Sequence, residues 1–511
     1  MLAKTFSTAL LGIDAYRVEV EVDVVRGAER SVVVGLPDAA VKESLDRVRS
    51  AISNSGYFQP QNYAIINLAP ADIRKEGPSF DLPIAIGLMI SDNQIAPERA
   101  ADYALTGELA LDGSVRPVKG CLSMALECKR SGMRGLILPE QNAREAGVVK
   151  EIEIIPVRNL SEAAGFICGS LNIPPVEVDI ETIFEDGLQT EIDFGDVKGQ
   201  EHVKRALIVA AAGHHNILMI GPPGSGKTML ARRIPTILPK LTPLEALETT
   251  RVHSVSGLLP PGRSLVVMRP FRSPHHTASS AALVGGGTIP RPGEVSLAHK
   301  GVLFLDEFPE FSRVSLEALR QPLEEGSVTV SRAAMRLTFP AEIMLIAAMN
   351  PCPCGHYGSA RHHDCHCEPF EVKRYRNRIS GPLLDRIDIH VDVPAVAYRD
   401  LKSEDVGLTS EQVRDMVTFS RRRQTERFAG TSVTANAMMT PKMIKKHCVL
   451  DEPCELLIEQ AMGMLGLSAR AYTRILKVAR TIADLEGAEN IGQHHIGEAI
   501  NYRDMDRNRS W

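Results

Sequence analysis

Hydrophobic and polar positions in the first third of the chain follow the periods of both strands and helices. Residues 18–25, VEVEVDVV, alternate with a period of two, which predicts a half-buried strand. Residues 40–52, AVKESLDRVRSAI, and residues 80–90, FDLPIAIGLMI, predict helices. We therefore expect residues 1–170 to form a mixed α/β domain.

The pattern changes twice in the rest of the chain. Residues 171–192 are acidic, contain a pair of prolines and lack a helical period, as is typical of a linker. Residues 193–395 contain apolar runs of strand length and predict a second α/β domain. Helical patterns such as SEQVRDMVTFSRRRQTERF dominate residues 396–511 and predict a small helical domain. A chain of 511 residues is too long for one hydrophobic core, which agrees with three domains.

A phosphate-binding pattern lies early in the second α/β segment. The sequence GPPGSGKT at 221–228 fits G-x-x-x-x-G-K-[ST] and joins an apolar strand, NILMI, to a predicted helix, MLARRI. In this context the glycines let backbone N–H groups surround phosphates at a helix N-terminus, while Lys227 reaches the β- and γ-phosphates and Thr228 holds Mg²⁺. The predicted nucleotide-binding residues are Gly221, Pro222, Pro223, Gly224, Ser225, Gly226, Lys227 and Thr228.

Two further apolar strands end in polar residues. The run VLFL is followed by Asp306 and Glu307. An acidic residue at the carboxyl end of a strand can hold the Mg²⁺ shell, and the next one can polarise the attacking water. The run IMLIAAM ends at Asn350, which we expect beside the γ-phosphate, orienting water. The alternative for Asn350 is a residue that starts a turn before Pro351.

Composition and charge narrow the class of protein. The chain is 44% hydrophobic and 24% charged, as is ordinary for a globular protein. No apolar run approaches the roughly 18 residues that span a bilayer. Asp14 interrupts the apolar stretch near the N-terminus and no cleavage-like site follows, so we expect a cytoplasmic protein without membrane contact. The net charge of −5 gives no global argument for nucleic acid, so any DNA contact must depend on local basic patches.

The nine cysteines are unevenly distributed. Five are scattered and expected in the core, whereas four form two C-x-C pairs within residues 352–367. Four thiolates satisfy tetrahedral Zn²⁺, so we predict a structural zinc that braces this loop. Free thiols and a redox pair are the alternatives. The predicted ligands are Cys352, Cys354, Cys365 and Cys367, and His356, His362, His363 or His366 could replace one of them.

The order of these motifs, followed by GPLLDRIDIHVDVP, resembles the AAA+ ATPases, in particular the ComM/YifB family of their magnesium-chelatase-like branch, over nearly the whole chain. The resemblance implies an α/β fold with an N-terminal Lon-protease-like (S5 domain 2-like) domain, a central AAA+ P-loop domain and a C-terminal helical lid. It places Val197 and Gly199, within DVKGQEHVKRAL, against adenine. It also implies Arg386 as an arginine finger for the adjacent subunit, whereas by itself an arginine between two aspartates would indicate a structural salt bridge. Arg470 is implied as a second sensor, with Arg474 one turn further on as a competitor.

The same resemblance implies a substrate. Members of this family are expected to form a homo-hexamer that hydrolyses ATP with Mg²⁺ and translocates on single-stranded or branched DNA. Such a helicase would drive branch migration of recombination intermediates, and so homologous recombination, in natural transformation. Residues 268–287 and a predicted hairpin at 328–339 would face the pore, unless they are merely solvated charged loops. The arginines that would neutralise DNA phosphates there are Arg269, Arg272, Arg332 and Arg336.

Another class of function is an ATP-dependent protease or a protein-remodelling ATPase. Residues 75–89 and 113–128 resemble the proteolytic domain of Lon, and Ser79 aligns with its nucleophile. The expected lysine base falls at Leu122, however, and Lys119 has the wrong offset. A serine without a neighbouring base is weakly nucleophilic, so we expect a degenerate domain that serves ring assembly or DNA entry. A third class, insertion of Mg²⁺ into a porphyrin, would require separate large subunits.

Overall fold

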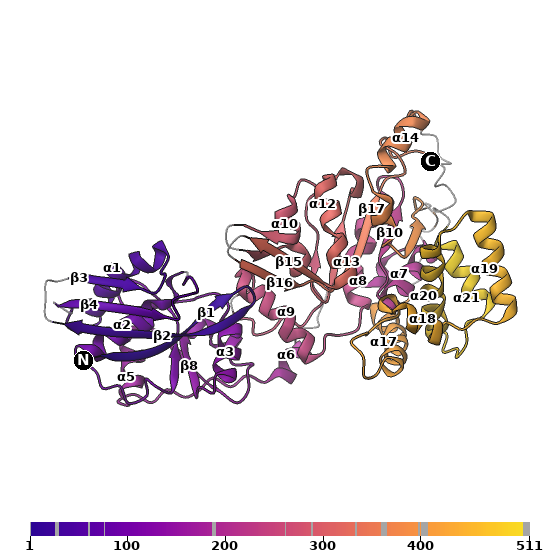
Figure 1. The fold of residues 1–511 in the computed structure, drawn as a ribbon. Coiled ribbons are helices and arrows are strands. Elements are labelled where there is room, and N and C mark those ends of the chain that lie inside the picture. Colours follow the sequence, from indigo (N-terminus) through magenta and orange to yellow (C-terminus); the bar gives the residue numbers. More distant parts are fainter. Residues whose placement is uncertain are drawn as a thin grey trace. The chain divides into compact units, whose positions relative to one another are not determined.

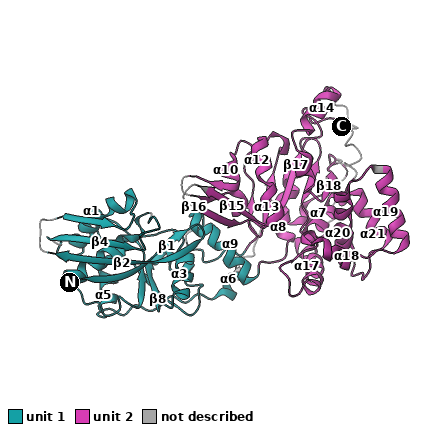
Figure 2. Ribbon diagram, in the orientation of Figure 1, with its two compact units in different colours: residues 1–187, 242–267 teal, residues 188–241, 268–511 magenta. Residues whose placement is uncertain are grey.

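The computed structural model describes most of the chain, namely residues 2–25, 30–59, 62–75, 77–186, 191–260, 262–287, 290–332, 335–358, 365–396, 399 and 407–503. It divides into two compact units (Figure 2). The first unit is Met1–Gly187 with Thr242–Val267, and the second is Leu188–Leu241 with Met268–Trp511. The division differs from the expected boundaries, because residues 242–267 leave the predicted central segment and pack in the first unit. The predicted central and helical domains together form the second unit.

The first unit is built on a seven-stranded mixed sheet in the order β3-β4-β2-β1-β5-β8-β9 (Figure 1). Its strands are β1 Ala3–Leu11, β2 Asp14–Val25, β3 Arg30–Val34, β4 Tyr63–Ala69, β5 Tyr103–Leu105, β8 Gly135–Pro139 and β9 Glu153–Val157, with a small pair β6 Glu108–Leu109 and β7 Val115–Arg116. Its helices are α1 Ala39–Asn54, α2 Asp81–Ser91, α3 Cys121–Arg130, α4 Glu140–Ala146, α5 Leu160–Ile167, α6 Ile180–Asp186 and α9 Pro243–Ser256, with a 3-10 turn η1 Pro78–Phe80.

The strand and both helices predicted in this unit are present. The period-two pattern lies on β2, where Val18, Val20 and Val22 are fully buried. Asp38 caps α1 by accepting a hydrogen bond from Val41 N. Every residue of α2 is buried, which explains why its sequence is apolar on all sides.

The predicted linker contains a helix that the sequence pattern did not reveal. Helix α6 begins after Asp179, whose carboxylate accepts hydrogen bonds from Glu181 N and Thr182 Oγ1 at 3.0 and 2.7 Å. Ile183 and Phe184 on this helix pack against the core that also contains α3. Capping and these apolar contacts outweigh the high local charge, so part of the segment folds onto the first unit.

The second unit contains a five-stranded parallel sheet in the order β11-β14-β17-β10-β18. Its elements up to the end of this sheet are η2 Phe194–Asp196, α7 Glu201–Gly213, β10 Ile217–Ile220, α8 Lys227–Ile237, β11 Phe271–Arg272, α10 Ser280–Val284, β12 Gly285–Gly286, β13 Arg291–Pro292, α11 Glu294–Leu297, β14 Val302–Leu305, η3 Phe308–Glu310, α12 Arg313–Ala318, α13 Arg320–Glu325, β15 Ser327–Arg332, β16 Met335–Pro340, β17 Met344–Met349, α14 Pro369–Arg376, α15 Gly381–Leu384 and β18 Ile389–Asp392. The predicted hairpin is present as β15 and β16, which pair antiparallel.

The rest of the second unit is helical, as expected. Its elements are α17 Ser410–Arg427, η4 Asn436–Met438, α18 Pro441–His447, α19 Glu452–Leu465, α20 Ala469–Leu485 and α21 Gln493–Asn501. Strand β10 joins these helices to the sheet, because Ile217 and Met219 pack in a core shared with α7, α8 and α20. Leu218 and Ile220 point into the core on the opposite face. Within the described parts of the chain, no helix is long and apolar enough to cross a membrane.

Candidate nucleotide and metal sites

The phosphate-binding loop begins where β10 ends. Because β10 pairs in parallel with β17 and β18, the carboxyl ends of these strands meet at one edge of the sheet. Gly224 and Gly226 have φ angles of 73° and 89°, in the left-handed region that favours glycine. A Cβ atom on Gly221 would lie 2.1 Å from the carbonyl oxygen of Val393. Glycine therefore stands where the loop turns and where the next strand approaches its backbone.

Lys227 lies inside this loop and is only 8% exposed. Its Nζ donates to the carbonyl oxygens of Gly221 and Pro222, at 2.7 and 3.0 Å. It also donates to Oδ1 of Asn350, 3.3 Å away at the end of β17. Burial lowers the pKa of Lys227 below its usual value, and the carboxylate of Asp306 opposes this effect. The structure thus brings together the lysine and the asparagine that the sequence placed at separate strand ends.

Thr228 and Asp306 also meet at this edge. Thr228 Oγ1, in the first turn of α8, donates a hydrogen bond of 2.8 Å to Asp306 Oδ2, directly after β14. A hydroxyl and a carboxylate are the oxygen ligands that Mg²⁺ takes from protein when it also binds phosphates. The two residues therefore fit a Mg²⁺–nucleotide complex.

Glu307 has a partner that the sequence analysis missed. Its Oε2 lies 2.8 Å from Nδ1 of His276, within ion-pair distance. His276 stands in the segment predicted to face DNA, and the spacing along the chain carries no signal that links it to Glu307. Only the pairing of β11 with β14 brings the two residues close.

The segment predicted to contact adenine is tied to the phosphate loop. Val197 is buried and Gly199 has a φ of 64°. The next residue, Gln200, donates through Nε2 to the carbonyl oxygen of Ser225, 2.9 Å away, and to that of Pro394, 2.7 Å away. Gln200 thereby holds this segment beside the loop, a role that the sequence analysis did not assign.

Arg386 and Arg470 lie at the opposite edge of the sheet from Lys227. Asn216, which precedes β10, donates through Nδ2 to the carbonyl oxygen of Arg386, 2.9 Å away. The guanidinium of Arg386 pairs with Glu324 on α13. Arg470 Nη1 lies 3.1 Å from Oδ2 of Asp385, the neighbour of Arg386 in sequence. With a rise of about 3.3 Å per strand residue, the length of β10 separates the backbone of Arg386 from the phosphate loop by about 13 Å.

Arg474, the alternative to Arg470 as second sensor, forms an ion pair with the buried carboxylate of Asp388. It contacts Asp388, which is 1% exposed and also accepts a hydrogen bond of 2.9 Å from His215 Nδ1. Burial by itself would raise the pKa of Asp388, but the charge of Arg474 and the bond from His215 hold it well below its usual value. The side chain of Arg470, in contrast, is 71% exposed. Arg470 is therefore the more exposed of the two arginines.

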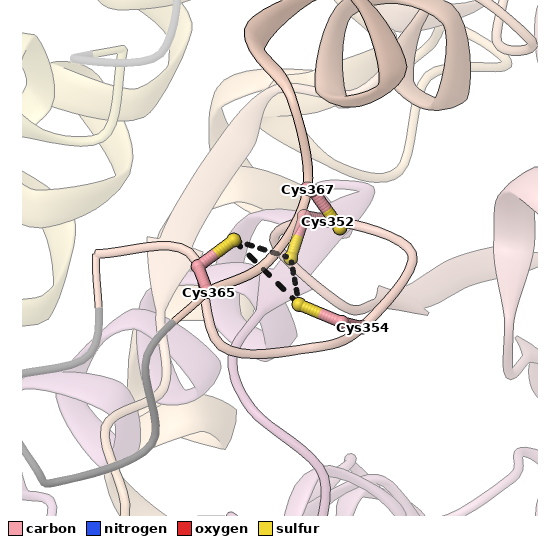
Figure 3. Close-up of side chains that lie close together, drawn as sticks. All are labelled: Cys352, Cys354, Cys365 and Cys367. Carbon is pink, nitrogen blue, oxygen red and sulfur yellow. Dashed lines mark hydrogen bonds between the residues drawn. The ribbon is translucent and has the colours of Figure 1, made fainter.

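The four loop cysteines gather in space (Figure 3). The sulfur of Cys352 lies 3.3 Å from that of Cys354 and 3.8 Å from that of Cys365, and the sulfurs of Cys354 and Cys365 are 3.6 Å apart. A tetrahedral zinc with Zn–S bonds of about 2.3 Å would separate its sulfurs by about 3.8 Å. Tyr357 N donates to the sulfur of Cys352, as a backbone donor to a metal thiolate would. The four residues therefore fit Zn²⁺.

Packing at this loop agrees with such a site, and the four thiols differ in their pKa. A hydrogen bond from the backbone of His356 lowers the pKa of Cys354 to about 6, whereas the pKa of Cys365 and that of Cys367 are raised, so Cys354 is the thiol that ionises most readily without a metal. The loop also packs against the phosphate site, since a Cβ atom on Gly355 would lie 2.5 Å from Cδ of Pro223. Of the alternative histidine ligands, His362 and His363 lie outside the described residues, and the described His356 and His366 are not part of the cluster.

Glu486, His494 and His495 form a second cluster of side chains of metal-ligand type, but their hydrogen bonds show that they cap a helix. Glu486 Oε2 lies 3.0 Å from Nε2 of both His494 and His495. The backbone N–H of Gly492 donates to Nδ1 of His495, at 2.8 Å, so the proton of this imidazole is on Nε2. A protonated nitrogen cannot bind a metal, and we assign the group to capping of α21.

Two of the four predicted DNA-contacting arginines are engaged within the chain. Arg269 donates to the carbonyl oxygens of Pro239 and Lys300, at 2.6 and 2.7 Å. Arg272 forms a bidentate pair with Glu294, at 2.6 and 2.8 Å. Arg336 on β16 is exposed, and Arg332 lies on β15 beside the hairpin tip. The DNA prediction therefore depends on the hairpin.

The residues of the protease alternative do not form a catalytic pair. Ser79 lies in η1 and is 9% exposed, and Leu122, at the position of the expected base, is fully buried in α3. Lys119 is exposed, and its side chain packs against Gly257 of the same unit. We find no proteolytic site among these described residues.

The comparisons with known proteins cover nearly the whole chain. The family described as magnesium chelatase, subunit ChlI, matches residues 193–401. Related families described as subunit ChlI of Mg-chelatase and as its C-terminal part match residues 20–142 and 407–503. The chain is 45% identical to competence protein ComM of Haemophilus influenzae over 510 residues, which are 99% of this chain and 98% of the relative. It is 43% identical to the uncharacterized protein YifB of Escherichia coli over 509 residues, again 99% and 98% of the two chains. A magnesium-chelatase 38 kDa subunit of Rhodobacter capsulatus is 25% identical over 329 residues, 59% of this chain and 84% of the relative.

Proposed function

Because this chain belongs to the ComM/YifB family of magnesium-chelatase-like AAA+ proteins, we propose that it is a cytoplasmic, ATP-driven hexameric motor that moves on single-stranded or branched DNA. It would act as a helicase that promotes branch migration of recombination intermediates in natural transformation. The observation that carries the ATPase part is the meeting of Lys227, Thr228 and Asp306 at one sheet edge.

The residues at this edge support in-line hydrolysis of ATP. Lys227 binds the β- and γ-phosphates, and Thr228 and Asp306 would hold Mg²⁺, which neutralises charge on the phosphates. Glu307 polarises the attacking water and Asn350 orients it. The loop from Gly221 to Thr228 supplies backbone N–H groups, and Val197 and Gly199 border the adenine.

The opposite edge would complete the site of the next subunit. In one chain the length of β10, about 13 Å, separates the backbone of Arg386 from the phosphate loop, which is further than an arginine side chain reaches. In a closed ring one edge of each subunit faces the other edge of its neighbour. We propose that Arg386 stabilises the charge that develops on the γ-phosphoryl group of the neighbour, and that Arg470 senses the same nucleotide.

The first unit would support the ring and would have no catalytic activity of its own. We infer a degenerate Lon-protease-like domain, supported by the apolar Leu122 at the position of the catalytic lysine. The second unit would have the AAA+ core and its helical lid. Assembly of the ring or entry of DNA is the role that we propose for the first unit.

The hairpin arginines give a direct test of the hypothesis that this protein binds DNA. We expect branched DNA to stimulate ATP hydrolysis, and Arg332→Ala or Arg336→Ala to remove that stimulation while leaving the rate without DNA unchanged. Loss of one phosphate contact should also reduce the slope of log affinity against log salt by about 1 per subunit. Fluorescence anisotropy over a salt series measures this slope. Arg422→Ala is the control, because Arg422 pairs across one helix turn with Glu426 on the exposed face of α17. Stimulation that survives both hairpin substitutions would contradict the DNA contact.

The cysteine cluster predicts a metal content. We propose that Zn²⁺ bound by Cys352, Cys354, Cys365 and Cys367 braces the loop between Asn350 and the segment of Arg386, without a catalytic duty. Elemental analysis of purified protein should give about one zinc per chain, and Cys354→Ser should lower this value and the melting temperature. Cys168→Ser, which alters a cysteine outside the cluster, should change neither. Protein that purifies folded and without zinc would contradict the site.

A further inference from the structure

A pocket of about 590 Å³ opens on the second unit between η3, the start of α12 and α14. Its charged lining residues, which define the basic pocket, are Arg313, Lys373, Arg374, Arg378 and Glu310. Arg378 pairs with Glu310 over 2.6 Å. Within the described part of the chain, the other three cations form no ion pair. The pocket therefore has uncompensated positive charge in a chain whose net charge is −5.

An exposed aromatic side chain, Phe370 of α14, completes the lining of the basic pocket. Phe370 is 67% exposed, and the guanidinium carbon of Arg374 lies 5.8 Å from the centroid of its ring. Aromatic residues and arginine are enriched in protein interfaces, where an aromatic anchor is covered by the partner and charges surround it. The pocket therefore has the composition of a surface that binds another macromolecule.

The opposite charge pattern lies on α19 of the same unit. Glu452, Glu455 and Glu459 are exposed, and the sequence of α19 contains no basic residue. Among the residues that the structure describes, these glutamates have no ion-pair partner. Their spacing of three, four and seven positions places them on one side of the helix, together with Leu456, which is 51% exposed. These four residues form an acidic face with an exposed aliphatic side chain.

We propose that the basic pocket of one chain binds the acidic face of α19 of a second copy of this chain. That the copies form a ring rests on the proposed function, whereas the choice of these two surfaces rests on their charges and exposed apolar side chains. No residue of α19 lines the pocket of its own chain. Figure 1 shows α14 at the top of the second unit and α19 at its far right end. A contact between two different surfaces repeats from copy to copy, and it forms a ring where the rotation closes.

Nucleic acid is the other macromolecule that a basic surface attracts, but the pocket fits it less well. Glu310 places a negative charge within the lining, and a row of phosphates would be repelled by it. The acidic face instead offers three unpaired carboxylates to the three unpaired cations. Leu456 also gives the ring of Phe370 an aliphatic side chain to pack against. Charge and apolar contact therefore both favour a second copy.

The test reverses the charges of the two surfaces in the full chain. One variant carries Lys373→Glu with Arg374→Glu, and the other carries Glu455→Lys with Glu459→Lys. Because like charges then face each other, each variant alone should need a chain concentration at least about tenfold higher for half-assembly. Sedimentation velocity with a non-hydrolysable ATP analogue measures this concentration. All four positions are exposed, so the melting temperature should stay the same.

Mixing the two variants shows whether the contact joins two chains. In an equal mixture each reversed pocket can meet a reversed α19 of the other variant, and each unchanged pocket an unchanged α19. Assembly should then return to the concentration of the unmodified chain, through alternating copies. A chain with all four substitutions should assemble in the same way. If the two surfaces instead met within one chain, the fourfold variant would be restored and the mixture would not.

The control changes the net charge by the same amount elsewhere. Arg422→Glu with Lys442→Glu alters exposed positions on α17 and α18 and should leave the half-assembly concentration unchanged. If the unmodified chain assembles and both charge-reversed variants assemble equally well, the inference is overturned while the proposed ring stands. The same holds if Lys373→Glu with Arg374→Glu weakens only the binding of single-stranded DNA, which would assign the pocket to nucleic acid. An unmodified chain that stays monomeric at all concentrations would overturn both the ring and this contact.

Discussion

Replacing Arg386 by alanine is expected to lower the turnover of ATP by about 10³- to 10⁵-fold, the effect of removing an arginine finger, while nucleotide binding persists. The physical reason is the position of the guanidinium. It pairs with Glu324 at the amino edge of the sheet, one strand length from Lys227 of the same chain. In the proposed ring, its charge would stabilise the transition state in the site of a neighbouring subunit. Steady-state hydrolysis and equilibrium binding of a fluorescent nucleotide measure the two quantities separately.

Mixed assemblies distinguish this trans arrangement from any role within one chain. Chains with Arg386→Ala retain an intact phosphate loop, whereas chains with Lys227→Ala retain the finger. If each site combines two subunits, mixing the two inactive variants should restore a fraction of the turnover. Arg422→Ala, on the exposed face of α17, should keep full turnover. Two variants that stay inactive on mixing, or an active Arg386→Ala chain, would contradict the trans arrangement.

Replacing Asp388 by asparagine is expected to lower the free energy of unfolding by about 3–5 kcal/mol, the cost of breaking a buried ion pair from one side. Asp388 is 1% exposed and contacts both Arg474 of α20 and His215 before β10. The substitution removes the negative charge but leaves the guanidinium of Arg474 partly buried. Because the native charge holds α20 against the sheet, we also expect the nucleotide-dependent turnover to fall.

Denaturant unfolding of the full chain measures this change. Glu426→Gln is the matched control, because it breaks an exposed ion pair with Arg422 and should cost about 0.5 kcal/mol or less. An Asp388→Asn chain as stable as this control would show that the buried pair makes no net contribution. The same measurement on Arg470→Ala should show a nearly unchanged free energy of unfolding, because this arginine is exposed and its ion pair with Asp385 lies in water.

Local sequence patterns were sufficient to predict most of the helices and strands and the residues at one edge of the nucleotide site. Residues 217–220 and 344–349 are strands because apolar runs of that length are buried on both faces of a parallel sheet. Lys227, Asp306 and Asn350 each follow or adjoin a strand end, so a rule about parallel sheets was enough to expect them together. The short helix at 180–186 was missed because its stability comes from contacts with a distant core.

The amino-acid sequence by itself determined the phosphate loop, the strand-end residues and the paired cysteines, because each depends on neighbours within a few positions. Only the tertiary structure decided that Arg474 pairs with the buried Asp388 while Arg470 is exposed, and that Arg269 and Arg272 are engaged within the chain. It alone brought His276 to Glu307 and the cysteine loop to Pro223. The physical reason is that the partner of a side chain depends on which segments the fold packs together. The spacing of residues along the chain does not reveal which distant segments become neighbours.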